Sequence, residues 1–586
     1  MGVKMRGRAR QPGMISVTRA VLVVTLCLIL GACGPGLIQT RPDAGELPDE
    51  YGLVAIKVIT NARSLEGPLE NWTSAFVVDL HDEEKRYELE ASTEGLSSAR
   101  VFVGALPPGD YAIYNLQSYQ KQGDVSRWMN APVPRSTGTF TVEDRRITSL
   151  GSLVYHSLGE VEVQGRAQRL YLLPRLDEDE DMLDFIADSF PDAFGEMNQD
   201  FLLGWDPLDT TDLVDERLEM AKRIRSFAVG LNFHWLGEDE IVMTGAMGQI
   251  FHRAGESEWN RTDTGQNRQL LSLVGHGDGY LAGGERGLMM RADSLEGPWE
   301  KLPGPGEREG IYWLDSNPEG GVHALTRRDG RVTLYRLDQE LSDWQDLWQY
   351  EYRPGMFFTG AGHVHATASD SGSIFVFGDQ SRLEFTPEND TPEVHSSRNF
   401  FSWTKQPDGT IVGVPGHWWS GTSSPEFSTD NGRSWTDVES SPAIERLRHP
   451  RRSKPILVSE SEVLAFARRE IRHQESLRRL SYEDEYRLRL FQDGEDIVYW
   501  GEPVDEDCTE LLGAISTPSL VFATCEDGRI YRTEDGGMEW ILDFEPGQEL
   551  DEDDDLLDPE EVVARVESSI HDWLPVPFRQ PPNQSG

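Results

Sequence analysis

The sequence predicts a mainly β protein, in which a small β-sandwich and a short helical connector precede a ring of repeated β-sheet units. Three observations lead to this prediction. The 586 residues include 56 Gly and 33 Pro, which favours many turns over long helices. Short apolar stretches alternate with polar turns. Units of 40 to 45 residues recur in the second half of the chain.

Composition narrows the class of protein. Asp and Glu number 101 against 55 Lys and Arg, which gives a formal net charge of −46. A chain this acidic is a poor partner for nucleic acid, because phosphate binding depends on Lys and Arg. Hydrophobic residues make up 38% of the chain and Trp numbers 16, which is enough to form a packed core. Four cysteines are too few for a disulfide scaffold.

The N-terminus has the pattern of an export signal. Basic residues precede an apolar run, Ala20–Ala32, whose 13 residues are too few to span a bilayer. The run ends in Leu30-Gly31-Ala32-Cys33-Gly34, which resembles the lipobox of bacterial lipoproteins. The preceding basic residues are Lys4, Arg6, Arg8, Arg10 and Arg19.

This resemblance implies that residues 1–32 are a removed signal peptide and that Cys33 carries lipid. The lipid bilayer would then be a partner, because several acyl chains anchor a protein stably. Gly34 in place of Asp favours the outer membrane of a Gram-negative bacterium by the family's sorting rule. Residues 33–50 would form a flexible tether. The alternative is an ordinary signal peptide with a chance cysteine.

Cys508 and Cys525 are predicted to form a disulfide. The strands Thr509–Ser516 and Ser519–Thr524 flank a turn at Thr517-Pro518, and opposed residues of an antiparallel hairpin have a constant sum of residue numbers. That rule places the two cysteines opposite each other. An exported protein can keep such a bond, which would stabilise the fold by roughly 3 kcal/mol. The alternative is a pair of small buried apolar side chains.

Residues 51–158 are predicted to form a small β-sandwich from short alternating strands. The segment Val101–Tyr111 places a strand, a Leu-Pro-Pro-Gly turn and a second strand in succession. This hairpin resembles the prealbumin-like sandwich of exported proteins, which implies a spacer or an adhesion module. The clearest predicted strands are Leu53–Ile59, Ser74–Leu80, Ser98–Val103, Asp110–Leu116 and Ile147–Leu153.

Two acidic segments flank the second half of the chain. Residues 159–225 are predicted to be a helical connector, with helices over Glu178–Phe194 and Asp212–Arg225. Residues 546–586 are predicted to be an acidic tail with a short helix over Pro559–Trp573. The apolar side of that helix would allow it to dock on the preceding domain.

Two eight-residue stretches match the pattern S/T-x-D-x-G-x-x-W. They are Ser428–Trp435 and Thr533–Trp540, and they resemble the Asp-box of BNR propellers. The resemblance implies a hairpin turn between the third and fourth strands of a blade. In that turn Asp caps backbone N–H groups, Gly takes a positive φ and Trp packs between blades. The structural residues would be Ser428, Asp430, Gly432, Trp435, Thr533, Asp535, Gly537 and Trp540.

The spacing of other tryptophans extends the repeat. Trp259, Trp299 and Trp344 each close a four-strand unit, and the longer intervals to Trp435 and to Trp540 each hold one further unit. The count predicts a seven-bladed β-propeller over residues 226–545. Propellers with these boxes include sialidases, sortilin-type receptors and photosystem II assembly factors. The resemblance therefore indicates the fold and leaves the function open.

The sequence predicts no catalytic residue, no cofactor and no metal site. Sialidases resemble one another in a Phe/Tyr-Arg-Ile-Pro motif before the first box and in an arginine triad, and neither can be assigned in this sequence. Nucleophile-elbow, zinc-protease, phosphate-loop and Cys-x-x-Cys motifs are also missing. His363 and His365 share one face of a strand, but packing or solvent contact explains them more simply than a metal pair.

A candidate binding surface lies in loops that are predicted to share one face of the propeller. These loops, Val414–Pro425, Ser440–Lys454 and Arg468–Asp484, concentrate basic residues within an acidic chain. Arg binds carboxylate or phosphate through two hydrogen bonds, and Trp offers a flat surface for stacking. The candidate binding residues are His417, Trp418, Trp419, Arg448, Arg451, Arg452, Arg468, Arg469, Arg472, Arg478 and Arg479.

These loops suit an envelope protein or a glycan as the partner. We therefore predict a non-enzymatic binding or assembly scaffold, with a sialidase-like glycan hydrolase as the alternative function. The loop residues also have an alternative role. The arginines can pair internally with neighbouring acidic residues on a short helix, while the two tryptophans pack against a blade. Those acidic residues are Glu470, Glu475, Glu483 and Asp484.

Overall fold

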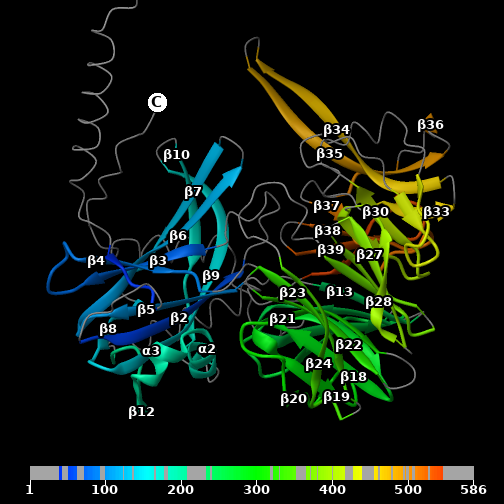
Figure 1. The fold of residues 1–586 in the computed structure, drawn as a ribbon. Helices are drawn as coiled ribbons and strands as arrows, with labels where there is room; N and C mark the ends of the chain where they lie inside the picture. The colour runs from blue at the N-terminus through cyan, green and yellow to red at the C-terminus, as the bar shows by residue number, and fades with distance from the viewer. Residues whose placement is uncertain are drawn as a thin grey trace, which may run out of the picture.

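The computed structural model describes residues 38–545, apart from seven longer segments and several gaps of up to five residues. The longer segments are 43–49, 62–71, 93–98, 208–231, 352–363, 416–425 and 438–454. The described residues form two bodies of β-sheet (Figure 1). No helix among them is long and apolar enough to cross a membrane. The expected signal peptide, Cys33 and the acidic tail lie outside the described residues.

Two sheets form the N-terminal β-sandwich. The first contains β1 (Ile38–Gln39), β3 (Trp72–Asp79), β4 (Arg86–Glu90), β6 (Gly109–Gln122), β7 (Val125–Pro132) and β8 (Phe140–Val142). The second contains β2 (Gly52–Asn61), β5 (Ala99–Leu106), β9 (Arg146–Val163), β10 (Arg166–Leu172), β11 (Arg175–Leu176) and β12 (Asn198–Leu203). Their orders are β1-β4-β3-β6-β7, with β8 beside β6, and β10-β9-β2-β5, with β11 and β12 beside β9. The five strands predicted for this region correspond to β2, β3, β5, β6 and β9.

The main core of the sandwich lies between its two sheets. Val54, Ile56 and Val58 alternate along β2 and are fully buried in it, because successive side chains of a strand point to opposite faces. Trp72 and Tyr155 meet edge to face in the same core, with 4.9 Å between ring centroids. Buried apolar surface contributes about 25 cal/mol per Å², so burial of this layer stabilises the domain.

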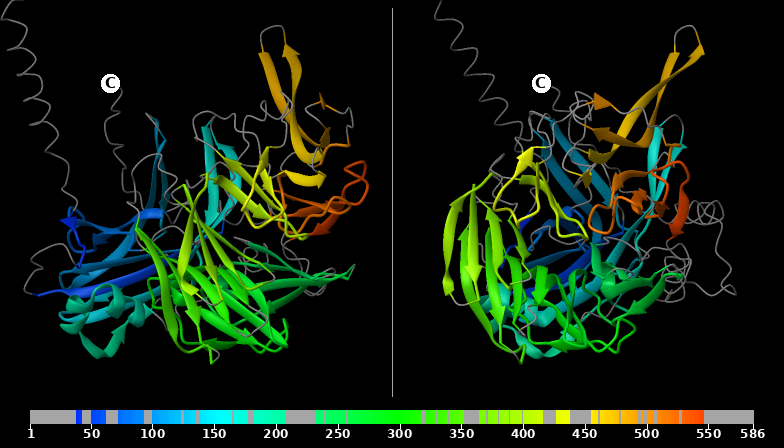
Figure 2. Two further views of the ribbon diagram at one scale, coloured as in Figure 1. Left: turned by 45° about the vertical axis from the view of Figure 1, so that its right-hand side comes forward. Right: turned by 90° about the vertical axis from the view of Figure 1, so that its right-hand side faces the viewer.

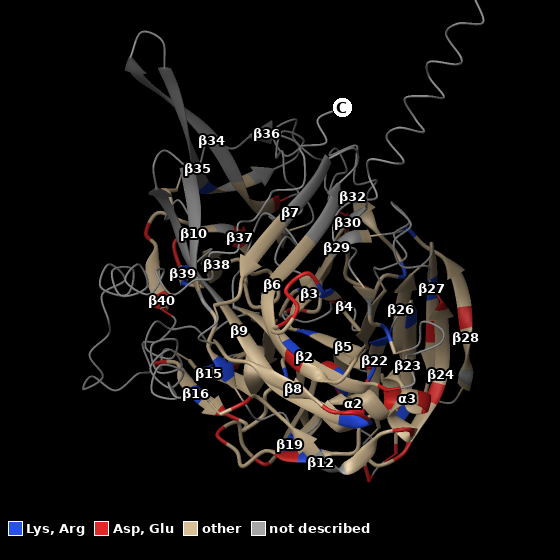
Figure 3. Ribbon diagram, turned by 90° about the vertical axis from the view of Figure 1, so that its left-hand side faces the viewer, with Lys and Arg blue, Asp and Glu red and all other residues tan. Residues whose placement is uncertain are grey.

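Two helices cover the outer face of the second sheet. Leu53 and Ala55 of β2 are buried there with Phe185 of α2 (Met182–Ser189), and α3 (Pro191–Gly195) follows directly (Figure 3). We expected one helix over Glu178–Phe194. The helix is instead broken before Pro191, because proline lacks an N–H donor and restricts the residue before it.

The segment 159–203 also differs from the helical connector expected there. β9 continues to Val163, which lies opposite Arg166 at the start of the antiparallel strand β10. β12 pairs in parallel with the start of β9. These residues therefore extend the sandwich, because the long strand β9 offers backbone groups that need partners. The second expected helix, Asp212–Arg225, lies outside the described residues.

Seven four-stranded antiparallel sheets follow in the described part of residues 232–544. Each is a meander of consecutive strands, and together they are arranged as a β-propeller (Figure 2). The first four sheets are β13 (Asn232–Gly237), β14 (Glu240–Thr244), β15 (Gln249–Ala254), β16 (Asn260–Asp263); β17 (Leu270–His276), β18 (Gly279–Gly284), β19 (Met289–Ala292), β20 (Glu300–Leu302); β21 (Gly310–Ser316), β22 (Val322–Arg328), β23 (Arg331–Leu337), β24 (Trp344–Glu351); and β25 (His365–Ala368), β26 (Ile374–Gly378), β27 (Ser381–Thr386), β28 (Asn389–Ser396). The remaining three are β29 (Phe400–Lys405), β30 (Ile411–Pro415), β31 (Glu426–Ser428), β32 (Thr436–Asp437); β33 (Ile456–Ser459), β34 (Glu462–Ser476), β35 (Arg479–Gln492), β36 (Glu495–Asp496); and β37 (Cys508–Leu511), β38 (Val521–Cys525), β39 (Ile530–Thr533), β40 (Ile541–Phe544).

Contacts between the first and last of these sheets close the ring. Phe251 of β15 meets Phe544 of β40 with 5.3 Å between ring centroids. Asp543 of β40 accepts a hydrogen bond from the indole of Trp259 at 3.0 Å and forms an ion pair with Arg253. The mainly β fold predicted from the sequence is therefore confirmed.

Turns of the first two propeller sheets contact the sandwich. The 3₁₀ turns η3 (Ala246–Gly248) and η4 (Glu285–Gly287) each join the second and third strands of their sheet. Ala246 and the adjacent Met247 pack against Ile59 of the sandwich. Lys57 of β2 and Glu285 of η4 form an ion pair of 2.8 Å in which both side chains are buried.

The predicted disulfide between Cys508 and Cys525 is confirmed. The two cysteines lie opposite each other on β37 and β38, are fully buried and are bonded. Beyond them the register shifts by one, so that Glu510 lies opposite Thr524. The constant-sum rule therefore holds at the cysteines, and a local irregularity ends it one step later.

A long hairpin, β34 and β35, projects from the propeller (Figure 2). Its strands pair from Glu462 opposite Gln492 to Ser476 opposite Arg479. Where a loop or a short helix was expected, over Arg468–Asp484, the chain is in strand conformation up to Ser476 and again from Arg479. Pairing across the hairpin satisfies backbone groups that a loop would leave to water.

Candidate functional site

A central cavity of about 690 Å³ lies among the first strands of the propeller sheets. Its described lining comes mainly from β13, β17, β21, β25, β29 and β37, each of which is the first strand of its sheet. The cavity is therefore the central channel of the propeller. Its volume lies within the range of small-molecule sites, roughly 300–1,000 Å³.

Three polar residues mark one end of this channel. Asp315 lies near the end of β21, Lys405 ends β29 and Gln406 follows it. Successive strands of a sheet are antiparallel, so the end of a first strand and the turn between strands two and three lie at opposite ends of the ring. η3 and η4, which are turns between strands two and three, contact the sandwich. Asp315, Lys405 and Gln406 therefore lie at the end of the channel away from the sandwich.

Aromatic side chains form much of the channel wall. The ring of His365 meets that of Trp403 edge-on with 4.9 Å between centroids, and Phe377 contacts Trp403 at 5.2 Å. These contacts between β25, β26 and β29 hold the indole in place. The half-buried aromatic residues of the wall are Phe233, Trp235, Tyr312, Trp313 and Trp403. Rings in such positions can stack on a ligand.

Asp315 is a titratable group of the wall. Burial raises the pKa of its carboxyl to about 6, although the nearby Lys405 acts in the opposite direction. Lys405 Nζ also donates a hydrogen bond to the carbonyl oxygen of Ala368 at 3.1 Å. Asp315 therefore changes charge slightly below neutral pH. A second carboxylate, Glu510 of β37, lines the same cavity.

His234 is a neutral group of the same wall. Burial lowers the pKa of its imidazole to about 4, and Nε2 lies 3.1 Å from the hydroxyl of Thr244. His363 lies outside the described residues, so the weak metal-pair pattern with His365 stays open. No group of three or more His, Cys, Asp or Glu side chains in the described part of the chain is placed to hold a metal ion.

The predicted binding loops are largely outside the described part of the chain. His417, Trp418, Trp419, Arg448, Arg451, Arg452 and Arg478 lie in segments that the structure does not describe. Arg468, Arg469 and Arg472 fall on β34, and Arg479 begins β35, where only the backbone is described. A shared binding surface formed by these residues stays a prediction.

The two repeated eight-residue motifs form the same turn in two sheets. In the first, the hydroxyl of Ser428 accepts a hydrogen bond from the N–H of Gly432 at 2.7 Å, and Asp430 accepts one from the N–H of Ser434 at 2.9 Å. In the second, Gly537 N–H donates to Thr533 at 2.9 Å, and Asp535 accepts from the N–H groups of Met538 at 2.9 Å and Glu539 at 3.1 Å. Gly432 and Gly537 have φ of 76° and 92°. Trp435 and Trp540 contact Phe400 and Phe466 with tilted rings, at 4.2 and 6.0 Å between ring centroids.

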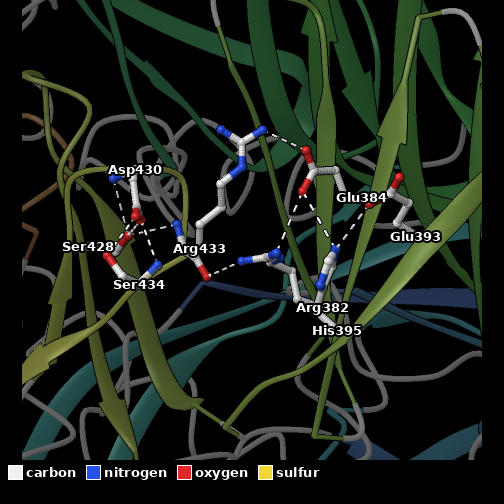
Figure 4. A network of polar contacts seen from close by, with 9 residues as sticks. Arg382, Glu384, Glu393, His395, Ser428, Asp430, Arg433 and Ser434 are labelled. Carbon is white, nitrogen blue, oxygen red and sulfur yellow. Dashed lines mark hydrogen bonds and ion pairs between the residues drawn. The ribbon is translucent and has the colours of Figure 1, made fainter.

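An ionic network ties the first of these turns to the preceding sheet (Figure 4). Arg433 Nη2 donates to Glu384 Oε1 of β27 at 2.6 Å, and Arg382 Nη1 donates to the carbonyl oxygen of Gly432 at 2.9 Å. The hydrogen bond from Arg433 holds the pKa of Glu384 below its ordinary value. The network has a structural role between neighbouring sheets and does not line the channel.

No family model and no curated protein matches the chain. Among solved structures, YCF48 bound to D1 peptide is 15% identical over 52% of this chain and 92% of its own, with a TM-score of 0.35. YCF48 from Cyanidioschyzon merolae is 13% identical over 53% and 84%, with a TM-score of 0.27. An inactive virginiamycin B lyase from Staphylococcus aureus is 10% identical over 52% and 94%, with a TM-score of 0.31. At such scores these similarities carry no argument about the site.

Sequence reasoning did not find the channel residues. The usable signal was a second set of tryptophans, Trp235, Trp313 and Trp403, which do not close a unit as Trp259 and its equivalents do. All three fall on first strands, which face the axis of a propeller.

Proposed function

We propose that this protein is a binding or assembly scaffold of the cell envelope, anchored by lipid on Cys33. The observation that carries the binding role is the central cavity, whose wall combines half-buried aromatic rings with polar side chains. A concave, largely apolar wall with a few convergent polar groups favours ligand binding. The assignment of the repeats as Asp-boxes and the count of seven blades belong to the same proposal. The two hydrogen-bonded turns and the seven described four-stranded sheets support them.

The contact between sandwich and propeller supports a scaffold role. The buried pair of Lys57 and Glu285 and the packing of Ala246 against Ile59 join the two bodies. The propeller would then keep a fixed orientation to the sandwich, and a flexible tether before the sandwich would link both to the membrane.

The anchor and the outer-membrane location rest on the N-terminal sequence. Cleavage before Cys33 would remove five basic and no acidic residues, which takes the net charge from −46 to −51. The disulfide suits the oxidising conditions outside the cytoplasm. Mass spectrometry of the protein from a Gram-negative host should find a lipid on Cys33 that Cys33→Ser abolishes. An N-terminus without lipid in the parent would contradict the anchor.

A glycan hydrolase is the second candidate function. Asp315 and Glu510 line one cavity, and burial raises the pKa of Asp315 to about 6. Most glycosidases use two carboxyl groups, one of which is protonated at the working pH. Release of reducing sugar from an envelope glycan, lost in Asp315→Asn, would favour the hydrolase. Binding without turnover would favour the scaffold.

The test of the scaffold is binding of the full-length chain, purified in detergent, to an array of glycans and fractionated envelope proteins. Two variants separate the two predicted surfaces. Trp403→Ala alters the channel, and a variant with Arg451, Arg452, Arg478 and Arg479 changed to Ala alters the predicted loops. Retention of a defined component by the parent, lost in one variant, supports the scaffold and locates the contact. No binding by the parent would contradict it.

A further inference from the structure

The channel wall holds a group of buried polar atoms that the described structure leaves without hydrogen-bond partners. On β25 and β29 they are the hydroxyls of Thr367 and Thr404 and the indole N–H of Trp403. The side-chain amide of Gln406, directly after β29, lacks partners at both its nitrogen and its oxygen. All four residues line the same cavity. Folded proteins contain few such atoms, so their concentration on one wall calls for an explanation.

These atoms belong to side chains that border a cavity large enough to hold a ligand. Thr367, Thr404 and Gln406 are 1%, 8% and 5% exposed. Their polar atoms are covered, so contact with a ligand requires rotation of these side chains. An amide and two hydroxyls each offer both a donor and an acceptor. A ligand that carries both hydrogen-bond donors and acceptors would therefore satisfy these groups.

The charges of the cavity limit the ligand further. The charged side chains of its described lining are Asp315, Glu510 and Lys405, and no Arg is among them. Strongly anionic ligands usually need Arg clamps, so carboxylated or phosphorylated compounds suit this wall poorly. The aromatic rings on the same wall, including Trp403, favour a ligand with an apolar face that can stack on them.

We propose that the channel binds a short neutral saccharide, whose hydroxyls satisfy Thr367, Thr404 and Gln406 while an apolar ring face stacks on Trp403. This inference rests on the proposed binding function of the propeller and names its ligand class. A sugar combines apolar C–H faces with many neutral donors and acceptors. It therefore suits both the aromatic rings and the unpartnered polar side chains of the wall. An organic cation would leave the acceptor and donor needs of the Gln406 amide unmet. A sialylated glycan is anionic, and the described lining has no Arg to bind its carboxylate.

The test measures binding and stability together in the full-length protein. N,N′-diacetylchitobiose, cellobiose and lactose are titrated by calorimetry, beside 3′-sialyllactose and choline. At least one neutral disaccharide should bind with a dissociation constant below 1 mM. Gln406→Leu should weaken that binding about tenfold or more without lowering Tm, because it replaces an unpartnered buried amide with an apolar group. Gln345→Leu, at an exposed position of β24, is the matched control and should leave affinity unchanged.

Trp403→Ala provides a second, larger change on the same wall and should abolish measurable saccharide binding. Preference for choline or for 3′-sialyllactose over every neutral sugar would overturn the proposed ligand class. Saccharide binding that Gln406→Leu and Trp403→Ala leave intact would overturn the proposed location. If no sugar binds but a captured envelope component is lost in Trp403→Ala, the ligand class fails and the scaffold stands. If the parent binds nothing, both fail.

Discussion

Lys57 Nζ lies 2.8 Å from Glu285 Oε1, and the two side chains are 1% and 7% exposed. Lys57 also donates to the backbone carbonyl of Asn267. The pair therefore joins the sandwich to the propeller inside a contact that water does not reach. Beside it, the guanidinium of Arg286 lies 5.4 Å from the ring centroid of Phe185 in α2. The two bodies are thus linked by buried polar and aromatic contacts.

Lys57→Met should be strongly destabilising. It removes the ammonium group that pairs with the buried carboxylate of Glu285, and breaking a buried pair in this way costs about 3–5 kcal/mol. Lys85→Met is the matched control, because Lys85 pairs with Asp82 at 3.5 Å with both side chains about half exposed. Its expected cost is at most about 0.5 kcal/mol. Denaturant unfolding checks both variants, and equal effects would show that the Lys57 pair does not hold the contact together.

Gly432→Ala should cost far more stability than Gly409→Ala. Both glycines have a positive φ, 76° and 85°, which Ala adopts at a cost of about 1 kcal/mol. A Cβ at Gly432 would lie 2.3 Å from Cζ of Phe377, whereas one at Gly409 meets open space. Overpacking adds about 1–3 kcal/mol at Gly432 alone. Thermal unfolding of the two variants side by side measures the difference, and equal Tm values would contradict the tight packing of this turn.

Reduction of the disulfide should lower the free energy of unfolding by about 3 kcal/mol, because the bond restricts the unfolded chain. Cys508 and Cys525 are separated by 17 residues and are fully buried. Unfolding in urea with and without dithiothreitol measures the change. In a control with both cysteines replaced by Ala, the reductant should have no effect. If the free energy of unfolding of the parent were the same with and without dithiothreitol, the bond would contribute little to stability.

Asp315→Asn should stabilise the protein at pH 7.5 and have a smaller stabilising effect near pH 4.5. The pKa of Asp315 is raised to about 6 by burial, above its ordinary value of 3.8. Between these two pH values the folded chain holds a proton that the unfolded chain releases, so the stability of the parent rises as the pH falls through 6. Above pH 6 the parent keeps the full cost of burying an ionised carboxylate at Asp315. The expected gain at pH 7.5 is about 1–3 kcal/mol. Comparison of variant and parent separates Asp315 from the other titratable channel residues, which are His234, Tyr312, His365, Lys405 and Glu510.

A pH-independent difference between Asp315→Asn and the parent would contradict the raised pKa. Carbon-13 NMR of the labelled carboxyl group gives a direct check, with a titration midpoint near pH 6 expected. A midpoint near pH 4 would mean that solvent reaches Asp315 freely.

Local pairing explains which elements could be predicted from sequence. Cys508 and Cys525 are joined by a short hairpin, so their register follows from the position of one turn. The repeated motif around Asp430 carries its own hydrogen bonds within a few residues, and its turn follows from those residues alone. The break before Pro191 also follows from a local rule, because proline has no N–H to donate within a helix.

The channel could not be predicted in the same way, because its wall is assembled from distant strands. Asp315, Trp403 and Glu510 meet only when the ring of sheets closes through contacts such as Phe251 with Phe544. The burial that raises the pKa of Asp315 comes from that closure and is not a property of the neighbouring sequence. The segment Arg468–Asp484 was expected to be a loop because it lies between two predicted strands of one blade, whereas its backbone pairs as a hairpin.

Structure determination of the full-length protein crystallised with N,N′-diacetylchitobiose tests the central claim most directly. The account predicts a sugar ring in the central channel, stacked on Trp403, with its hydroxyl or acetamido groups within hydrogen-bond distance of Gln406. A saccharide bound only at the loops around Arg451 and Arg478, or an unoccupied channel at saturating sugar, would contradict it.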